Sequence, residues 1–118
     1  MKIGILIAAL LAILMWWVTS TPDTTAPSSI NVDNAVIIDV RSPAEFAGGH
    51  IEGAVNLPID TITEADVLKL ASKEQSIVLY CHSGGRASSV QKKMTEWGFS
   101  SVVNLKTQSG VKRAMNLP

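Results

Sequence analysis

Residues 76–90 constrain the fold more than any other stretch, because they combine a strand pattern, a tight loop and a helix pattern. An apolar run of strand length ends at Cys81, the only cysteine of the 118-residue chain. Gly84 and Gly85 follow, and a segment with helical spacing opens at Arg86. This order predicts a buried strand with Cys81 at its carboxyl end, which is the edge where open α/β sheets bind ligands.

The loop from Cys81 to Arg86 has the composition of an anion-binding loop. Gly84 and Gly85 permit backbone angles that other residues avoid, so successive N–H groups can point inward. The following helix adds its N-terminal partial positive charge, and Arg86 adds a full one, so an anion or a carboxylate is expected as its partner. These groups favour the thiolate of Cys81. The alternatives are a buried core cysteine, a solvent-facing His82 and a surface Arg86.

The remaining patterns predict alternating strands and helices. Short strands are expected at 35–40, 54–57 and 101–105. Helices are expected after Ser42, where Glu45 is placed to bond back to the cap, over 63–71, and from Arg86 to Gly98. Glu45 is therefore interpreted as a capping residue rather than a catalytic one, and Trp97 as part of the core. Parallel connections between such elements predict a three-layer α/β domain, with helices on both faces of a short parallel sheet.

Three sequence blocks in a fixed order resemble the rhodanese (sulfurtransferase) family. They are Asp39-Val40-Arg41 followed by Glu45-Phe46, then residues 49–58, then Cys81-His82-Ser83-Gly84-Gly85-Arg86. The resemblance runs from about Val36 to Leu105 and is greatest to the single-domain phage-shock-protein-E type. It implies one rhodanese-like domain over residues 30–118. The family's phosphatase relatives have five residues between cysteine and arginine, whereas this chain has four, so the resemblance implies sulfur rather than phosphate chemistry.

The resemblance also assigns roles to individual residues. It implies Cys81 as the catalytic nucleophile, and Asp39 and Arg41 as residues that order the loops beside the site. It places His50 in a turn away from the sulfur. The implied substrate-binding residues follow the nucleophile directly: His82, Ser83, Gly84, Gly85 and Arg86. The family usually has a Gly-Gly pair after the last strand, and Ser109-Gly110 occupies its approximate place here, which leaves open how closely this turn approaches the site.

The activity implied is a double displacement. The Cys81 thiolate takes the outer sulfur of thiosulfate or a related donor, and the persulfide passes it to cyanide or a thiol acceptor. A non-catalytic or regulatory rhodanese-like module that binds a partner or carries a persulfide is the main alternative. A small phosphatase and a redox sensor based on Cys81 are two further ones.

Composition excludes several other classes of function. The chain has ten basic and ten acidic residues, and no basic patch indicates a nucleic-acid partner. A single cysteine cannot form an intramolecular disulfide. His50 and His82 lie far apart in the sequence without ligand spacing, so neither a metal nor another cofactor is expected.

The first 29 residues predict export. Residues 3–18 are uncharged and apolar after Lys2, so residues 1–20 are expected to be either a signal peptide or a membrane anchor helix. Lys2 on the cytoplasmic side would leave the domain periplasmic or otherwise extracytoplasmic. Residues 21–29 are rich in Pro, Ser and Thr and are expected to be a disordered linker.

Overall fold

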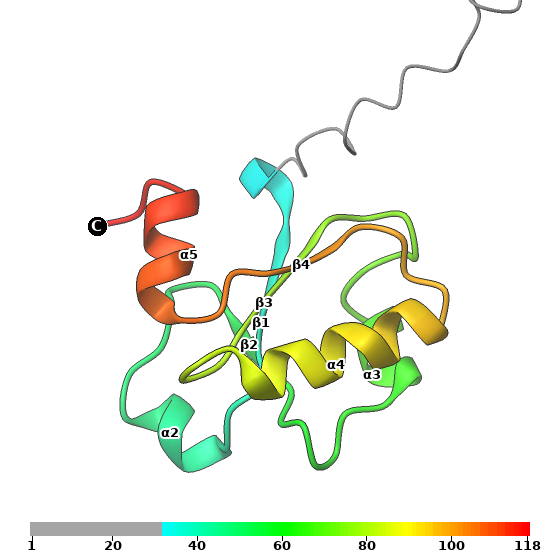
Figure 1. Cartoon of the computed structure of the whole chain (residues 1–118), viewed down its shortest axis with the longest axis horizontal. Helices are drawn as coiled ribbons and strands as arrows, with labels where there is room; N and C mark the ends of the chain where they lie inside the picture. The colour runs from blue at the N-terminus through cyan, green and yellow to red at the C-terminus, as the bar shows by residue number, and fades with distance from the viewer. Residues whose placement is uncertain (1–31) are drawn as a thin grey trace, which may run out of the picture.

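The computed structural model describes residues 32–118 (Figure 1). The predicted apolar helix, the linker and the cellular location all concern residues outside this range and stay predictions. Within residues 32–118, every helix is too short or too polar to cross a bilayer.

Four parallel strands form the sheet, in the order β2-β1-β3-β4. β1 spans Val36–Asp39, β2 Val55–Asn56, β3 Ile77–Tyr80 and β4 Val102–Asn104. The register pairs Ile38 of β1 with Val55 and Leu79, and Leu79 in turn with Asn104. The parallel sheet is confirmed, and each strand is shorter than its sequence pattern suggested. β3 lies in the interior of the sheet, so the loop that contains Cys81 leaves from a central strand.

Between residues 32 and 118, five helical segments connect and cover the strands. They are η1 (Val32–Asn34), α2 (Pro43–Ala47), α3 (Glu64–Leu68), α4 (Gly85–Glu96) and α5 (Gln108–Ala114). Ser42 and Thr63 begin α2 and α3 with reciprocal capping boxes, as their sequences predict. α3 ends earlier than expected because the Leu70 N–H bonds to the carbonyl of Val67, which tightens the last turn.

Two apolar clusters lie on opposite faces of the sheet and give the predicted three layers. One contains Ile38 and Leu79 and packs against α3 and α4. The other contains Ile37 and Val78 and packs against η1 and α5, which lies across the sheet from α4 in Figure 1. Trp97 is partly buried against the first cluster, in agreement with its predicted core role. Side chains of a strand alternate between faces, so Cys81 joins the α4 side and Tyr80 the α5 side.

Candidate active site

Backbone N–H groups after β3 stabilise the sulfur of Cys81. Cys81 follows β3 directly and is 1% exposed. The N–H of Gly84 donates to its Sγ at 2.9 Å, and its own N–H donates to the carbonyl of Lys106 at 3.0 Å. Cys81 is thus held from both sides, by its own loop and by the segment after β4.

These amides determine the ionisation of the thiol. Burial raises the pKa of Cys81, because a thiolate loses solvation in an apolar setting. The backbone N–H groups of Ala87, Gly84, Ser83 and Arg86 act in the opposite direction and outweigh burial, so the pKa lies below its ordinary value. The site therefore favours a thiolate without using a side-chain base.

The loop owes its shape to Gly84, to Asn104 at the end of β4 and to Lys106 after it. Gly84 is the N-cap of α4 and has a φ of +98°. Residues with a Cβ rarely adopt this backbone conformation. The side chain of Asn104 donates to the carbonyl of Gly84 at 3.0 Å and accepts from the N–H of Lys106 at 2.8 Å. The last strand is thereby tied to the nucleophile loop. α4 begins at Gly85, one residue earlier than predicted.

A small polar pocket opens over Cys81. It encloses about 290 Å³ and is lined by Arg41, Cys81, His82, Thr107, Gln108 and Ser109. The turn between β4 and α5 therefore reaches the site closely, although it lacks a Gly-Gly pair. Among the predicted substrate-binding residues, His82, Ser83 and Gly85 are exposed, Arg86 is partly buried and Gly84 is buried. A pocket of this size, next to a low-pKa thiol, suits a small anion.

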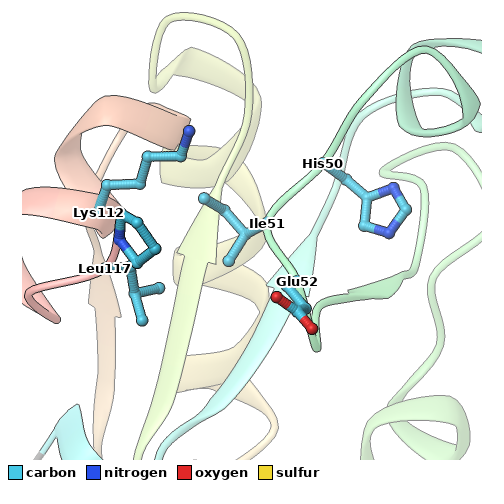
Figure 2. Close-up of a pocket in the computed structure, with 6 residues that line it drawn as sticks. His50, Ile51, Glu52, Lys112 and Leu117 are labelled. Carbon is cyan, nitrogen blue, oxygen red and sulfur yellow. The ribbon is translucent and has the colours of Figure 1, made fainter.

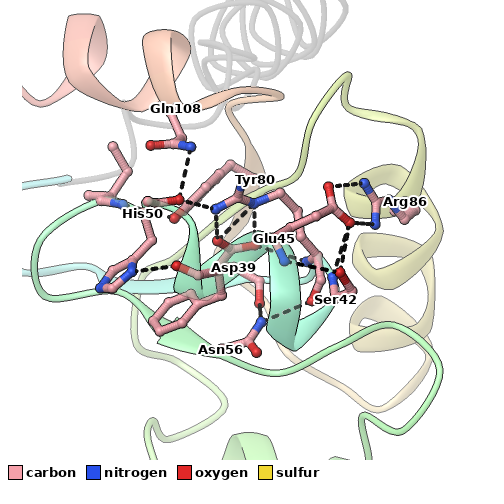
Figure 3. A network of polar contacts seen from close by, with 12 residues as sticks. Asp39, Ser42, Glu45, His50, Asn56, Tyr80, Arg86 and Gln108 are labelled. Atoms are coloured by element: carbon pink, nitrogen blue, oxygen red, sulfur yellow. Dashed lines mark hydrogen bonds and ion pairs between the residues drawn. The ribbon is translucent and has the colours of Figure 1, made fainter.

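Arg86 has a carboxylate partner within the chain. Its guanidinium donates to both carboxylate oxygens of Glu45, at 2.7 and 3.0 Å, as Figure 3 shows. Glu45 also completes the predicted capping box at Ser42. The hydrogen bond from Arg86 lowers the pKa of Glu45 to about 2, with contributions from Ser42. The expectation that Arg86 would have an anion or carboxylate partner is met by Glu45.

Asp39 and Arg41 form the buried centre of a polar network beside the pocket that Arg41 lines. Figure 3 draws the contacts of this network around the labelled Asp39. Arg41 is 6% exposed, and its guanidinium contacts both oxygens of Asp39 at 2.7 to 3.0 Å. It also donates to the carbonyl of Gly49 at 2.7 Å, to which Gln108 donates at 3.3 Å. The network therefore joins β1, the loop before β2 and α5, which is consistent with the loop-ordering role expected of this pair.

Tyr80 completes the network from the central strand. Its hydroxyl accepts the N–H of Ile51 at 3.0 Å, and the guanidinium of Arg41 lies 5.6 Å from its ring centroid. Burial raises the pKa of Tyr80 to about 12, against the opposing effect of the Ile51 N–H. The Tyr80 hydroxyl is therefore protonated near neutral pH, and it serves to hold the fold together.

His50, which the resemblance places in a turn away from the sulfur, is not among the residues that line the Cys81 pocket. Its ring stacks on Phe46 with centroids 3.6 Å apart, and its Nδ1 lies 2.9 Å from the carbonyl oxygen of Phe46. His50 borders a different cavity, of about 380 Å³. Figure 2 shows that Ile51 and Glu52 line this cavity from the loop before β2, and that Lys112 of α5 and Leu117 line it from the C-terminal part of the chain. Within residues 32–118, no three His, Cys, Asp or Glu side chains gather so that they could hold a metal ion.

Sequence reasoning missed the contribution of the last residue of β4 and of the segment that follows it. Asn104, Lys106, Thr107 and Gln108 either hold the Cys81 loop or line its pocket. One signal was available: the carboxyl ends of neighbouring parallel strands meet at the same edge of a sheet, so residues following β4 had to lie near those following β3.

The comparisons with known proteins agree with this geometry. The sequence model of the rhodanese-like domain matches residues 25–107. The chain belongs to the rhodanese-like domain family. Its similar proteins include thiosulfate sulfurtransferase PspE of Escherichia coli (strain K12), 28% identical over 67 residues that make up 57% of this chain and 64% of that protein. A putative mitochondrial thiosulfate sulfurtransferase of Schizosaccharomyces pombe is 36% identical over 84 residues, 60% of this chain and 58% of that protein.

Solved rhodanese-like structures have the same fold. The rhodanese-like domain superimposes on a rhodanese with anions from E. coli with a TM-score of 0.61 at 24% identity, covering 71% of this chain and 94% of that one. It superimposes on the Rhodanese_3 like domain of Alr3790 from Anabaena sp with a TM-score of 0.60 at 27% identity. This match covers 71% of this chain and 95% of that one. The chain spans about half to two thirds of the length of the first curated relatives.

Proposed function

We propose that this rhodanese-like domain is a thiosulfate sulfurtransferase that works through a persulfide on Cys81. The observation that carries the proposal is the position of the sulfur: a buried thiol of lowered pKa, held by the Gly84 N–H at 2.9 Å, below a polar pocket. The relatives named thiosulfate sulfurtransferase support the same donor.

The reaction is a double displacement. The Cys81 thiolate attacks the outer sulfur of thiosulfate, the bond between the two sulfurs of the donor breaks, and sulfite leaves with the electron pair. The enzyme then carries a persulfide anion. Cyanide or a thiolate attacks the terminal sulfur, which leaves as thiocyanate or a new persulfide, and the Cys81 thiolate is regenerated.

The loop amides are suited to both forms of the enzyme. N–H groups fixed by the fold need no rearrangement to stabilise a negative sulfur, whether it is the thiolate or the persulfide. In this proposal the substrate-binding loop consists of the five residues after the nucleophile: His82, Ser83, Gly84, Gly85 and Arg86. Arg86 contributes through its backbone and through a guanidinium that Glu45 already neutralises in part.

Replacing the nucleophile tests the proposal directly. Intact-mass analysis after incubation with thiosulfate should show one added sulfur atom on the wild-type chain, removed by cyanide with formation of thiocyanate. Cys81→Ser should neither gain the sulfur nor form thiocyanate above the uncatalysed rate. Thiocyanate formation by the serine variant at the wild-type rate would reject the mechanism.

A further inference from the structure

The positive charge that remains unpaired beside Cys81 lies after β4 rather than in the loop motif. Arg41 and Arg86 are each paired, with Asp39 and Glu45 respectively. Lys106 and Arg113 have no ion-pair partner among residues 32–118, and both are exposed. An anionic substrate that approaches the site therefore meets these two cations uncompensated.

Both cations line a groove next to the Cys81 pocket. The groove encloses about 540 Å³, and its lining consists of Ser83, Leu105, Lys106, Thr107, Gly110, Arg113 and Ala114. Thr107 borders both the groove and the Cys81 pocket, and Ser83 lies next to His82, so the two spaces adjoin. Among residues 32–118, no acidic residue lines either the groove or the Cys81 pocket.

Lys106 is fixed on the nucleophile loop. Its aliphatic stem lies against Gly84 so closely that a Cβ built on Gly84 would come 3.0 Å from its Cγ. Its carbonyl accepts the N–H of Cys81, and its backbone has a φ of +72°. The cation at the end of this stem is thus attached to the loop that carries the sulfur.

We propose that this groove binds the sulfur acceptor, and that the acceptor is a small thiol bearing carboxylates. The inference rests on the proposed function and names its second substrate. Thiosulfate needs only the pocket of about 290 Å³ over Cys81. The groove falls in the volume range of sites for organic ligands. Leu105 and Ala114 provide apolar surface for a carbon skeleton, and Lys106 and Arg113 provide charge for carboxylates.

The step assigned to the groove is balanced without another reactant. The acceptor thiol loses its proton to solvent, and its thiolate attacks the terminal sulfur of the Cys81 persulfide. The sulfur–sulfur bond of the enzyme breaks, and its electron pair returns to Cys81 as a thiolate. The product leaves as the acceptor's persulfide, so sulfur is transferred with no external oxidant or reductant.

The test compares two acceptors on persulfide-loaded chain. Glutathione carries two carboxylates and 2-mercaptoethanol carries none. The double variant Lys106→Gln/Arg113→Gln should raise the half-saturation concentration for glutathione, relative to that for 2-mercaptoethanol, by about five- to tenfold, because two exposed ion pairs are lost. Added salt should reduce the preference of the wild-type chain for glutathione over 2-mercaptoethanol. The control Lys92→Gln/Lys112→Gln removes the same charge from exposed lysines outside both linings and should leave the ratio within about twofold.

An equal change for both acceptors, or an equal effect of the control variant, would overturn the proposal.

A direct binding experiment tests the groove independently of the proposed function. S-methylglutathione, which cannot accept sulfur, should shift the amide NMR signals of Lys106, Thr107 and Arg113 in the Cys81→Ser chain. The same shifts should be weaker in Cys81→Ser combined with Lys106→Gln/Arg113→Gln. Absence of shifts at these residues contradicts the groove even if the wild-type chain turns over thiosulfate.

Discussion

At the residue scale, the chemistry of Cys81 depends on backbone groups. Four N–H groups lower the pKa of a thiol whose burial would otherwise raise it. Their positions depend on Gly84, whose φ of +98° other residues avoid. The reactivity of Cys81 therefore depends partly on the absence of a side chain at Gly84.

The pH dependence of Cys81 alkylation tests this arrangement. Because the thiolate is the nucleophile and its pKa is lowered, the rate with iodoacetamide should fall as pH drops through a midpoint below the ordinary value of 9. Gly84→Ala should raise the midpoint and lower stability by about 1 kcal/mol, since a left-handed alanine is strained. Gly85→Ala, with nothing within 4 Å of its Cβ, is the matched control. A wild-type midpoint above 9, the ordinary value from which the pKa is lowered, would contradict this arrangement.

Glu45 combines two roles that the sequence presents separately. Its carboxylate caps α2 and binds the guanidinium of Arg86, 41 residues further along the chain. The capping box was readable from Ser42-Pro43-Ala44-Glu45 because it is local. The ion pair was not, since it depends on how α2 and α4 are placed around the end of the sheet.

Thermal unfolding of Glu45→Gln should show when the charge of Glu45 matters. The folded pKa of about 2 lies below the unfolded value of about 4.3, so the carboxylate stabilises the fold above pH 4.3 and loses that effect as pH falls toward 2. The glutamine side chain retains a capping oxygen, so the variant should have a lower Tm at pH 7 and approach the wild type near pH 2. A gap that stays constant down to pH 2 would exclude a charge effect.

At the scale of elements, the turn after β4 was the least predictable part of the site. The strand at 101–105 and its parallel pairing followed from an apolar run, because hydrophobic periodicity reports local structure well. The approach of Thr107 and Gln108 to Cys81 had no such local pattern, and only the shared edge at which parallel strands end pointed to it. It results from α5 packing beside the sheet, where Thr107 caps the helix by accepting the N–H of Gly110.

Gly110 is the residue that permits this packing. A Cβ at position 110 would overlap the carbonyl oxygen of Leu105, which is backbone and cannot move aside cheaply. We expect Gly110→Ala to cost about 1–3 kcal/mol in urea unfolding, as overpacking does. In Gly48→Ala the new Cβ would meet only ordinary contacts of 3.5–3.6 Å, so this control should change stability much less. Equal effects of the two substitutions would show that the position of α5 does not depend on Gly110.

At the scale of the whole molecule, the Asp39–Arg41 pair connects parts of the chain that are distant in sequence. Arg41 reaches Gly49 before β2, and Asn56 of β2 donates to the carbonyls of Asp39 and Arg41 at 3.0 and 2.9 Å. Gln108 adds α5 through the same Gly49 carbonyl. Their motif was recognisable in the sequence, whereas the buried network required the assembled fold.

Asp39→Asn should destabilise the domain strongly. Asp39 is fully buried, and the substitution leaves the buried guanidinium of Arg41 without its counter-charge, which costs about 3–5 kcal/mol in comparable pairs. Glu64→Gln breaks the exposed pair with Lys73 and should cost less than about 1 kcal/mol. Urea unfolding of both variants measures the difference. Similar losses would mean that the buried pair contributes no more than a surface one.

The two outer strands have a consequence for the protein at high concentration. β2 has two residues and β4 has three, so each edge of the sheet presents few open backbone groups to another chain. Growth of fibrils by strand addition needs a longer template than this. The folded domain should therefore resist ordered aggregation, and light scattering that rises only after unfolding would reveal this protection.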